Sequence, residues 1–198
     1  MTFMIQDRVS PEAVFCCIHR NGFRPGQLSK MRITENFSWA EVFTNRTSDD
    51  IIATPESVFD SALRQAERLE SVRNFLREKL TPRAIIQVTS WVRSPSSNAN
   101  MGGAKQSQHL RGNATDFIVP GYESVTGNRK VQALLCTQKD SIGFCLEITR
   151  GAWTHIDGRP SHLVFENQGK GQYSVWSLPQ MTAFARAYAV PSDSGESV

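Results

Sequence analysis

The sequence predicts an α+β fold in which helices pack on a mostly antiparallel central sheet. One long segment has the 3.6-residue apolar period of an amphipathic helix, and short segments rich in β-branched residues follow it. These segments come in the order helix, strands, helix, strands, which is typical of α+β folds. With 198 residues, the chain is long enough to form one domain with a buried core and no disulfides.

The long helix is predicted at about residues 55–80. Thr54 is the predicted N-cap, and Pro55 occupies the first helical position, where its missing N–H costs no hydrogen bond. One face of this helix is apolar, which predicts that it packs on a core. The residues of that face are Val58, Ala62, Leu69, Val72, Phe75, Leu76 and Leu80.

Strands are predicted on both sides of a long polar loop. Residues 84–90 and 114–119 have the composition of buried strands, and the Gly- and Ser-rich loop at 94–108 lies between them. Loops of this length are usually functional or disordered. A hairpin is predicted from residues 144–149 and 153–157. The remaining predicted elements are edge strands at 163–165 and 173–176 and short helices at 130–136 and 181–189.

Charge and cysteine content argue against several classes of protein. The net charge is +3, the isoelectric point is about 8.8, and Lys and Arg form no long run, so a nucleic-acid signature is weak. A mild positive field would help the protein approach an anionic polymer, or it reflects ordinary solvated charge. The four cysteines contain no C-x-x-C pair, which argues against a four-cysteine zinc site and favours reduced thiols. No segment approaches the roughly 20 apolar residues of a membrane helix.

Three residues have the chemistry of a hydrolytic metal site. His109 and Asp116 lie seven positions apart, with Gly112 between them to permit a sharp turn, and His155 lies on a separate predicted strand. A hydrolytic zinc site uses three such protein ligands and keeps a fourth position open. Hydrogen-bonded structural histidines would also fit the spacing, so spacing alone leaves both interpretations open.

Motifs around these residues support the metal interpretation. Thr89-Ser90-Trp91-Val92-Arg93-Ser94-Pro95 is followed by Asn98, by Gly102-Gly103-Ala104 and by Ser107-x-His109-x-x-Gly112-x-Ala114-x-Asp116. Together with Trp153-x-His155-x-Asp157, this order resembles the zinc D-Ala-D-Ala and L-Ala-D-Glu peptidases, the LAS group. That group includes VanX-like dipeptidases, phage endolysin peptidases and the related hedgehog N-domain. The resemblance covers roughly residues 30–160 and implies a hedgehog/DD-peptidase-like fold with zinc bound by His109, Asp116 and His155.

A general base is also needed, and here the sequence departs from part of the group. Many VanX-like members have an acidic residue three positions before the last zinc histidine, and Ala152 stands there in this chain. Similarity to other branches makes Glu147, at the end of the adjoining strand, the candidate base. A solvated hairpin carboxylate is an equally consistent interpretation of Glu147. Asp157 is a weaker candidate, since it could instead bond the backbone or Arg159.

Two further residues are implied to act on the substrate. The resemblance implies that Arg93 polarises the scissile carbonyl or holds a substrate carboxylate, tasks that suit a guanidinium group. A surface ion pair is the alternative for Arg93. Ser107 is implied to orient a ligand or the substrate.

We therefore predict a zinc metallopeptidase that hydrolyses peptidoglycan stem peptides. It would act as a D-Ala-D-Ala carboxypeptidase or an L-Ala-D-Glu endopeptidase, with a phage lysin as one fitting setting. Ala152 keeps open the alternative of a non-catalytic zinc-containing module that binds the cell wall or a protein, and the isoelectric point supports only weakly a nucleic-acid binder. We expect a monomer whose partner is a peptidoglycan peptide, without a nucleic-acid partner or a membrane span.

The domain prediction divides the chain into three parts. Residues 1–30 form an N-terminal extension of unknown role, residues 31–190 the zinc peptidase domain, and residues 191–198 a flexible tail. Residues 1–20 lack the apolar core of a signal peptide, so we expect synthesis in the cytoplasm and action at the bacterial cell wall.

Overall fold

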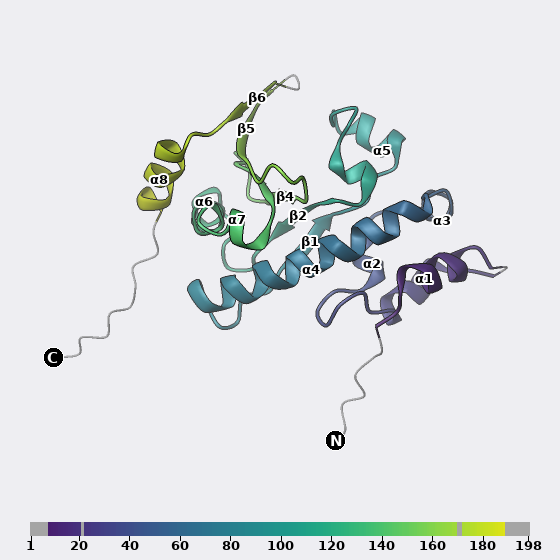
Figure 1. Cartoon of the computed structure of the whole chain (residues 1–198). Coiled ribbons are helices and arrows are strands. Elements are labelled where there is room, and N and C mark those ends of the chain that lie inside the picture. Colours follow the sequence, from purple (N-terminus) through teal and green to yellow (C-terminus); the bar gives the residue numbers. More distant parts are fainter. Residues whose placement is uncertain (1–7, 21, 170–171, 189–198) are drawn as a thin grey trace.

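The computed structural model describes residues 8–20, 22–169 and 172–188 (Figure 1). The α-helices are α1 (Pro11–Ile18), α2 (Trp39–Val42), α3 (Ser48–Ile52), α4 (Glu56–Lys79), α5 (Pro95–Asn100), α6 (Val125–Cys136), α7 (Lys139–Ile142) and α8 (Leu178–Ala187). Two 3₁₀ helices are η1 (Pro25–Lys30) and η2 (Gln108–Arg111). The strands are β1 (Gln87–Ser90), β2 (Ala114–Ile118), β3 (Cys145–Glu147), β4 (Thr154–Asp157), β5 (Val164–Gly169) and β6 (Gln172–Val175).

The strands form an open six-stranded sheet in the order β1-β2-β4-β3-β5-β6. Neighbouring strands are antiparallel except β3 and β5, which are parallel. The predicted α+β class with a mostly antiparallel sheet is confirmed. The predicted β3–β4 hairpin is present, and strands are found at both positions predicted for edge strands. Of these two strands, only β6 lies at an edge, because β5 pairs with both β3 and β6.

The long helix α4 is the main support of the sheet. Its apolar face is buried as the period predicted, and Val58, Ala62, Leu69, Val72 and Leu76 belong to the core. The predicted N-cap was one residue early: Pro55 is the cap, and the Thr54 hydroxyl instead donates to the carbonyl of Asp50 at the end of α3. The Thr54 side chain therefore hydrogen-bonds a backbone carbonyl of α3 and does not cap α4.

The two faces of the sheet have different roles. On the face toward α4, the buried Gln65 amide donates to the Thr115 hydroxyl and to the carbonyl of Ile156. Side chains alternate along a strand, so Asp116 and His155 point to the opposite face. Figure 1 shows the β5–β6 hairpin and the α5 segment rising on either side of the central strands.

The N-terminal segment packs on the same core. Val14 and Ile18 of α1 and Leu28 of η1 are each at most 1% exposed and join the core cluster that α4 forms. The predicted tail at 191–198 lies outside the described residues. Among the helices that the structure describes, none is both long and apolar enough to cross a membrane.

Candidate metal centre

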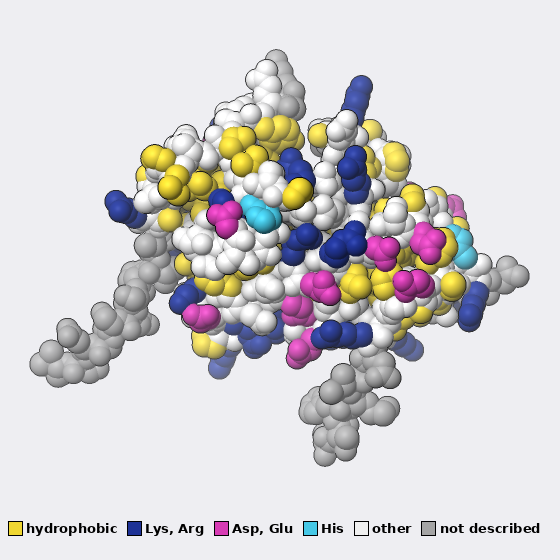
Figure 2. Space-filling model, viewed as in Figure 1, with side chains coloured by type: hydrophobic (Ala, Val, Ile, Leu, Met, Phe, Trp, Pro, Cys, Tyr) yellow, Lys and Arg dark blue, Asp and Glu magenta, His cyan; other side chains and the backbone are white. Residues whose placement is uncertain are grey.

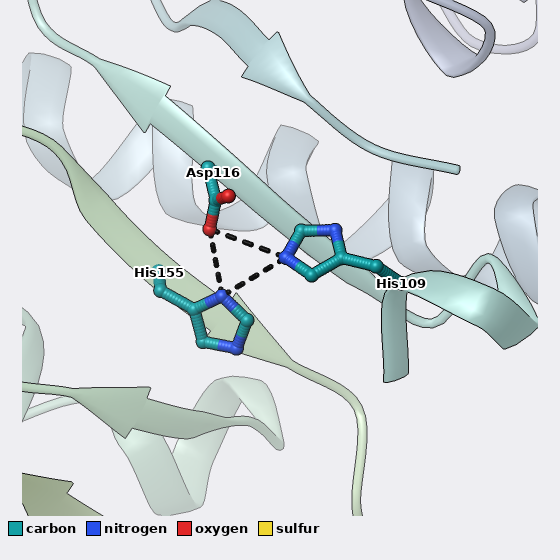
Figure 3. A group of neighbouring side chains, drawn as sticks. All are labelled: His109, Asp116 and His155. Atoms are coloured by element: carbon teal, nitrogen blue, oxygen red, sulfur yellow. Dashed lines mark hydrogen bonds and ion pairs between the residues drawn. The ribbon is translucent and has the colours of Figure 1, made fainter. Parts of the chain in front are cut away.

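His109, Asp116 and His155 converge on one point at the sheet surface (Figure 3). One potential ligand atom from each lies within 4.8 Å of the others. Asp116 Oδ1 is 2.7 Å from His155 Nδ1 and 3.3 Å from His109 Nε2, and the two imidazole nitrogens are 3.3 Å apart. Residues distant in sequence thus form a compact cluster of two nitrogens and one oxygen.

Backbone contacts fix the orientation of His109. Its Nδ1 lies 2.6 Å from the carbonyl oxygen of Trp91, which can only accept, so Nδ1 carries the proton and Nε2 offers its lone pair to the cluster. Ser107 caps η2, and its hydroxyl accepts from the His109 amide at 3.3 Å. Gly112 ends η2 at φ +69°, and a side chain there would press on the Val58 carbonyl of α4. Ser107 and Gly112 therefore place the helix turn that carries His109.

The sheet register brings the other members of the cluster together. Asp116 on β2 pairs with His155 on β4, and His155 in turn pairs with Glu147 on β3. Cross-strand partners share a face of the sheet, so all three side chains lie on the same side. The hairpin that the sequence predicted thus brings Glu147 beside His155.

Arg93 lies behind the cluster, bound to Asp116. One guanidinium nitrogen, Nη2, pairs with Asp116 Oδ2, and Nε donates to the Ser90 hydroxyl at 2.9 Å. The Arg93 side chain is only 10% exposed, so its ion pair is not on the surface. Arg93 therefore holds the outer oxygen of Asp116 while Oδ1 faces the histidines. Its predicted contact with a substrate carbonyl remains a prediction.

The two histidines have opposite electrostatic environments. Burial lowers the pKa of His109, with Asp116 opposing this only in part. Burial would also lower the pKa of His155, but hydrogen bonds to Asp116 and Asp157 overcome it and raise that pKa to about 10. Burial favours neutral Asp116, yet the neighbouring His109 and His155 hold its pKa well below the usual range. The cluster therefore holds an ionised carboxylate at neutral pH.

The two candidate bases differ clearly in their surroundings. Glu147 lines the cleft, and burial raises its pKa above the usual value. Asp157 is nearly fully buried and accepts from Arg159 through both carboxylate oxygens, at 2.8 and 2.7 Å. This ion pair matches the alternative interpretation of Asp157. Glu147 has the more suitable surroundings for proton transfer, while its catalytic role remains a prediction.

A cleft of about 420 Å³ opens over the cluster. One wall is the segment from Met101 to Gln108, which belongs to the predicted polar loop, and the other is the β5–β6 hairpin. The loop is ordered around α5, which Ser94 caps through its hydroxyl, and around Asn98, whose amide donates to the Ala104 carbonyl. His109, Asp116, Glu147 and His155 all line the cleft.

The donor set fits zinc. Tetrahedral ligands at about 2.0–2.1 Å from zinc lie roughly 3.3 Å apart, and two of the three donor separations have this value. The third, at 2.7 Å, is a hydrogen bond that a cation would replace. Two imidazoles and one carboxylate are the set that catalytic zinc sites use, with the cleft side available for a fourth ligand.

Comparison with known families agrees with this geometry. Residues 36–157, more than half of the chain, match the model of the family described as Peptidase M15. The chain therefore belongs to the Peptidase M15 family, whose members are zinc-dependent peptidases, and the predicted family and enzyme class are confirmed. Searches of curated proteins and of solved structures found no match.

The sequence motifs did not reveal every residue that builds the site. Ser90 and the Trp91 carbonyl were part of the recognised motif, but only the structure connects them to Arg93 and His109. Phe165 and Tyr173 were assigned only to the two predicted edge strands, 163–165 and 173–176, although both line the cleft.

Proposed function

We propose that this M15 peptidase hydrolyses peptidoglycan stem peptides, at a D-Ala-D-Ala or an L-Ala-D-Glu bond, with zinc held by His109, Asp116 and His155. The single observation that carries the proposal is the convergence of these three side chains beside Glu147 in one cleft. The peptide nature of the substrate follows from the family, and the cell-wall origin is supported by the motif resemblance.

The residues divide the chemistry between them. Zinc, when bound, supplies Lewis-acid polarisation of a carbonyl oxygen and activation of a water molecule. Glu147 accepts the proton of the attacking water and delivers it to the leaving amine, because a raised pKa makes this carboxylate a stronger base than an ordinary exposed one. Arg93 holds Asp116 in its ligating orientation through Oδ2.

We propose further that the enzyme acts at the bacterial cell wall. A phage lysis protein is one kind of protein that would act there. A net charge of +3 favours approach to an anionic polymer. A peptidase acting there must accept peptides attached to a large insoluble polymer, and the open cleft between two walls is compatible with such a substrate.

The direct test is digestion of purified peptidoglycan, with and without a chelator, followed by mass spectrometry of the released fragments. The proposal expects new amino termini at one of the two bonds, lost with the chelator and restored by zinc. Unchanged peptidoglycan in the presence of zinc would contradict the proposed substrate. Cleavage unaffected by the chelator would contradict the metal mechanism.

A further inference from the structure

A single row of paired residues crosses the whole sheet beneath the cleft. Its chemistry changes along its length, from metal ligands on β2 and β4, through an acid on β3, to apolar residues on β5 and β6. The members, in order, are Ser90, Asp116, His155, Glu147, Phe165 and Val175. The cleft floor therefore continues past the candidate base onto the β5–β6 hairpin.

The cleft carries much of the exposed apolar surface of the described residues. Nine large hydrophobic side chains are exposed among all the described residues, and five of these line this one cleft. The five are Met101, Trp153, Leu163, Tyr173 and Val175. Figure 2 shows hydrophobic side chains gathered over the β5–β6 hairpin. Such a concentration marks a binding surface better than scattered exposed residues do.

Packing holds the hairpin aromatics in place beside the metal cluster. The Phe165 ring is 6% exposed, with its centroid 6.5 Å from that of His155 and 5.5 Å from that of Tyr173. Arg159 lies over the same Phe165 ring at 4.9 Å. Tyr173 itself remains 45% exposed. Tyr173 and Val175 thus present an exposed apolar surface that the buried Phe165 ring supports, and these three residues are here called the hairpin subsite.

The position of Glu147 gives the cleft a direction. A base that returns its proton to the leaving amine must face that amine, so the chain beyond the scissile bond passes over Glu147 toward β5. Strands spaced about 4.8 Å apart place β5 and β6 roughly 10 and 14 Å from β4. An extended residue spans about 3.3–3.6 Å, so β5 and β6 lie roughly three and four residue lengths beyond the bond, within reach of a long side chain on the second residue after it.

The geometry points to the hairpin subsite as a binding site for an aliphatic side chain on the leaving-amine side, beyond the first residue. The inference rests on the proposed function and decides between its two bonds. Cleavage at L-Ala-D-Glu leaves a diamino acid after D-Glu, and its aliphatic chain reaches the subsite. Cleavage at D-Ala-D-Ala leaves a single residue with a methyl group, which does not. The protein is then an endopeptidase whose specificity is set by Phe165, Tyr173 and Val175.

The test compares soluble peptides that share L-Ala followed by γ-linked D-Glu and differ in the next residue, L-Lys amide or glycine amide. We expect kcat/KM to be roughly tenfold higher with lysine, the effect of burying about two methylene groups. Tyr173→Ala should reduce the ratio of the two kcat/KM values toward one, whereas Tyr173→Phe, which keeps the ring, should preserve it. Ile52→Ala, at a similarly exposed position outside the cleft, is the matched control and should leave both values unchanged.

The outcomes separate this inference from the proposed function. Two results overturn the hairpin subsite while the peptidase function stands. One is cleavage at L-Ala-D-Glu with equal kcat/KM for both peptides. The other is release of terminal D-Ala alone from a full stem peptide. If no stem peptide is cleaved, the proposed substrate fails, and saturation-transfer NMR with γ-D-glutamyl-L-lysine amide then decides the subsite. Transfer to the lysine methylenes that is lost in Tyr173→Ala supports it, and absence of transfer in the unaltered protein overturns it.

Discussion

The two ends of the cleft are built in opposite ways. At the metal end, each ligand is held by a second contact: His109 by the Trp91 carbonyl, Asp116 by Arg93, and His155 by Asp157 at 3.6 Å. At the hairpin end, Tyr173 and Val175 are about half exposed and present apolar surface. Buried contacts thus fix the geometry of the metal ligands, whereas the proposed substrate contact lies on partly exposed side chains of the β5–β6 hairpin. Substitutions at the first end should affect metal and turnover, and at the second the choice of substrate.

The largest effect is expected from His109→Ala. Removing one of three ligands leaves a site that cannot hold zinc in a catalytic geometry, so both bound zinc and peptidase activity should be lost. Metal content by mass spectrometry and peptide hydrolysis check this together. His19→Ala, at the exposed histidine that forms the C-cap of α1, is the control and should retain both. Retention of zinc and activity in His109→Ala would remove the basis of the metal site.

Glu147→Gln should separate metal binding from turnover. Loss of a general acid–base typically lowers kcat by about 10²–10⁴-fold. Zinc content should be unchanged, because Glu147 is not among the three ligands. Glu166→Gln, on the neighbouring strand and outside the cleft lining, is the matched control. A non-catalytic binding module would show no activity to lose, and equal kcat in the two variants would assign the base to another residue.

Arg93→Gln tests whether the support behind Asp116 matters. Loss of a residue that orients a metal ligand typically weakens metal affinity by about 10–100-fold. Competition with a chromophoric chelator measures this directly, and Arg93→Lys should recover part of the affinity through its charge. Arg111→Gln, at an exposed arginine of η2, is the control. Unchanged zinc affinity with lowered kcat would instead favour the direct contact with the substrate carbonyl that the family resemblance implies.

The affinity for zinc should also depend on pH. In the metal-free protein the pKa of His155 is raised to about 10, so its imidazole is protonated at neutral pH and must lose that proton to bind zinc. Affinity should therefore rise by up to about tenfold per pH unit between pH 7 and 9. Calorimetry in two buffers of different ionisation enthalpy should show about one proton released per zinc. Affinity independent of pH would contradict the charged His155.

The same shift has a consequence for the stability of the metal-free protein. The pKa of His155 is raised from 6.5, the value expected in the unfolded chain, to about 10 in the folded protein. Protonated His155 therefore stabilises the fold fully below pH 6.5, and this stabilisation is lost as the pH rises through about 10. The metal-free protein should thus unfold at lower temperature at pH 10 than at pH 7, and zinc should reduce this difference.

Sequence patterns predicted those features that depend on local chemistry. The 3.6-residue spacing of Val58, Leu69 and Leu76 predicted the long helix, and the Ser-x-His motif predicted His109 as a metal ligand. The predicted helix at 130–136 was too short: Ser124 caps α6 by accepting from the Gly127 amide, so this helix begins at residue 125. The Ser94-Pro95 pair likewise starts α5 within the predicted loop.

Features that depend on register between distant strands could not be predicted. The ion pair between Arg93 and Asp116 requires β1 and β2 to pair with a shift after Val88. The row that joins Glu147 to Phe165 requires the parallel β3–β5 pairing, which no local pattern specifies. These long-range pairings determine both the support of the metal cluster and the direction of the cleft.

The most direct test of the metal centre is X-ray absorption at the zinc edge of the zinc-loaded protein. We predict a first shell of nitrogen and oxygen at about 2.0–2.1 Å with scattering from two imidazole rings, and loss of bound zinc, and with it of this spectrum, in His155→Ala. The chain also contains four cysteines. A first shell with sulfur at about 2.3 Å, or an unchanged spectrum in His155→Ala, would contradict the assignment of His109, Asp116 and His155 as the zinc ligands.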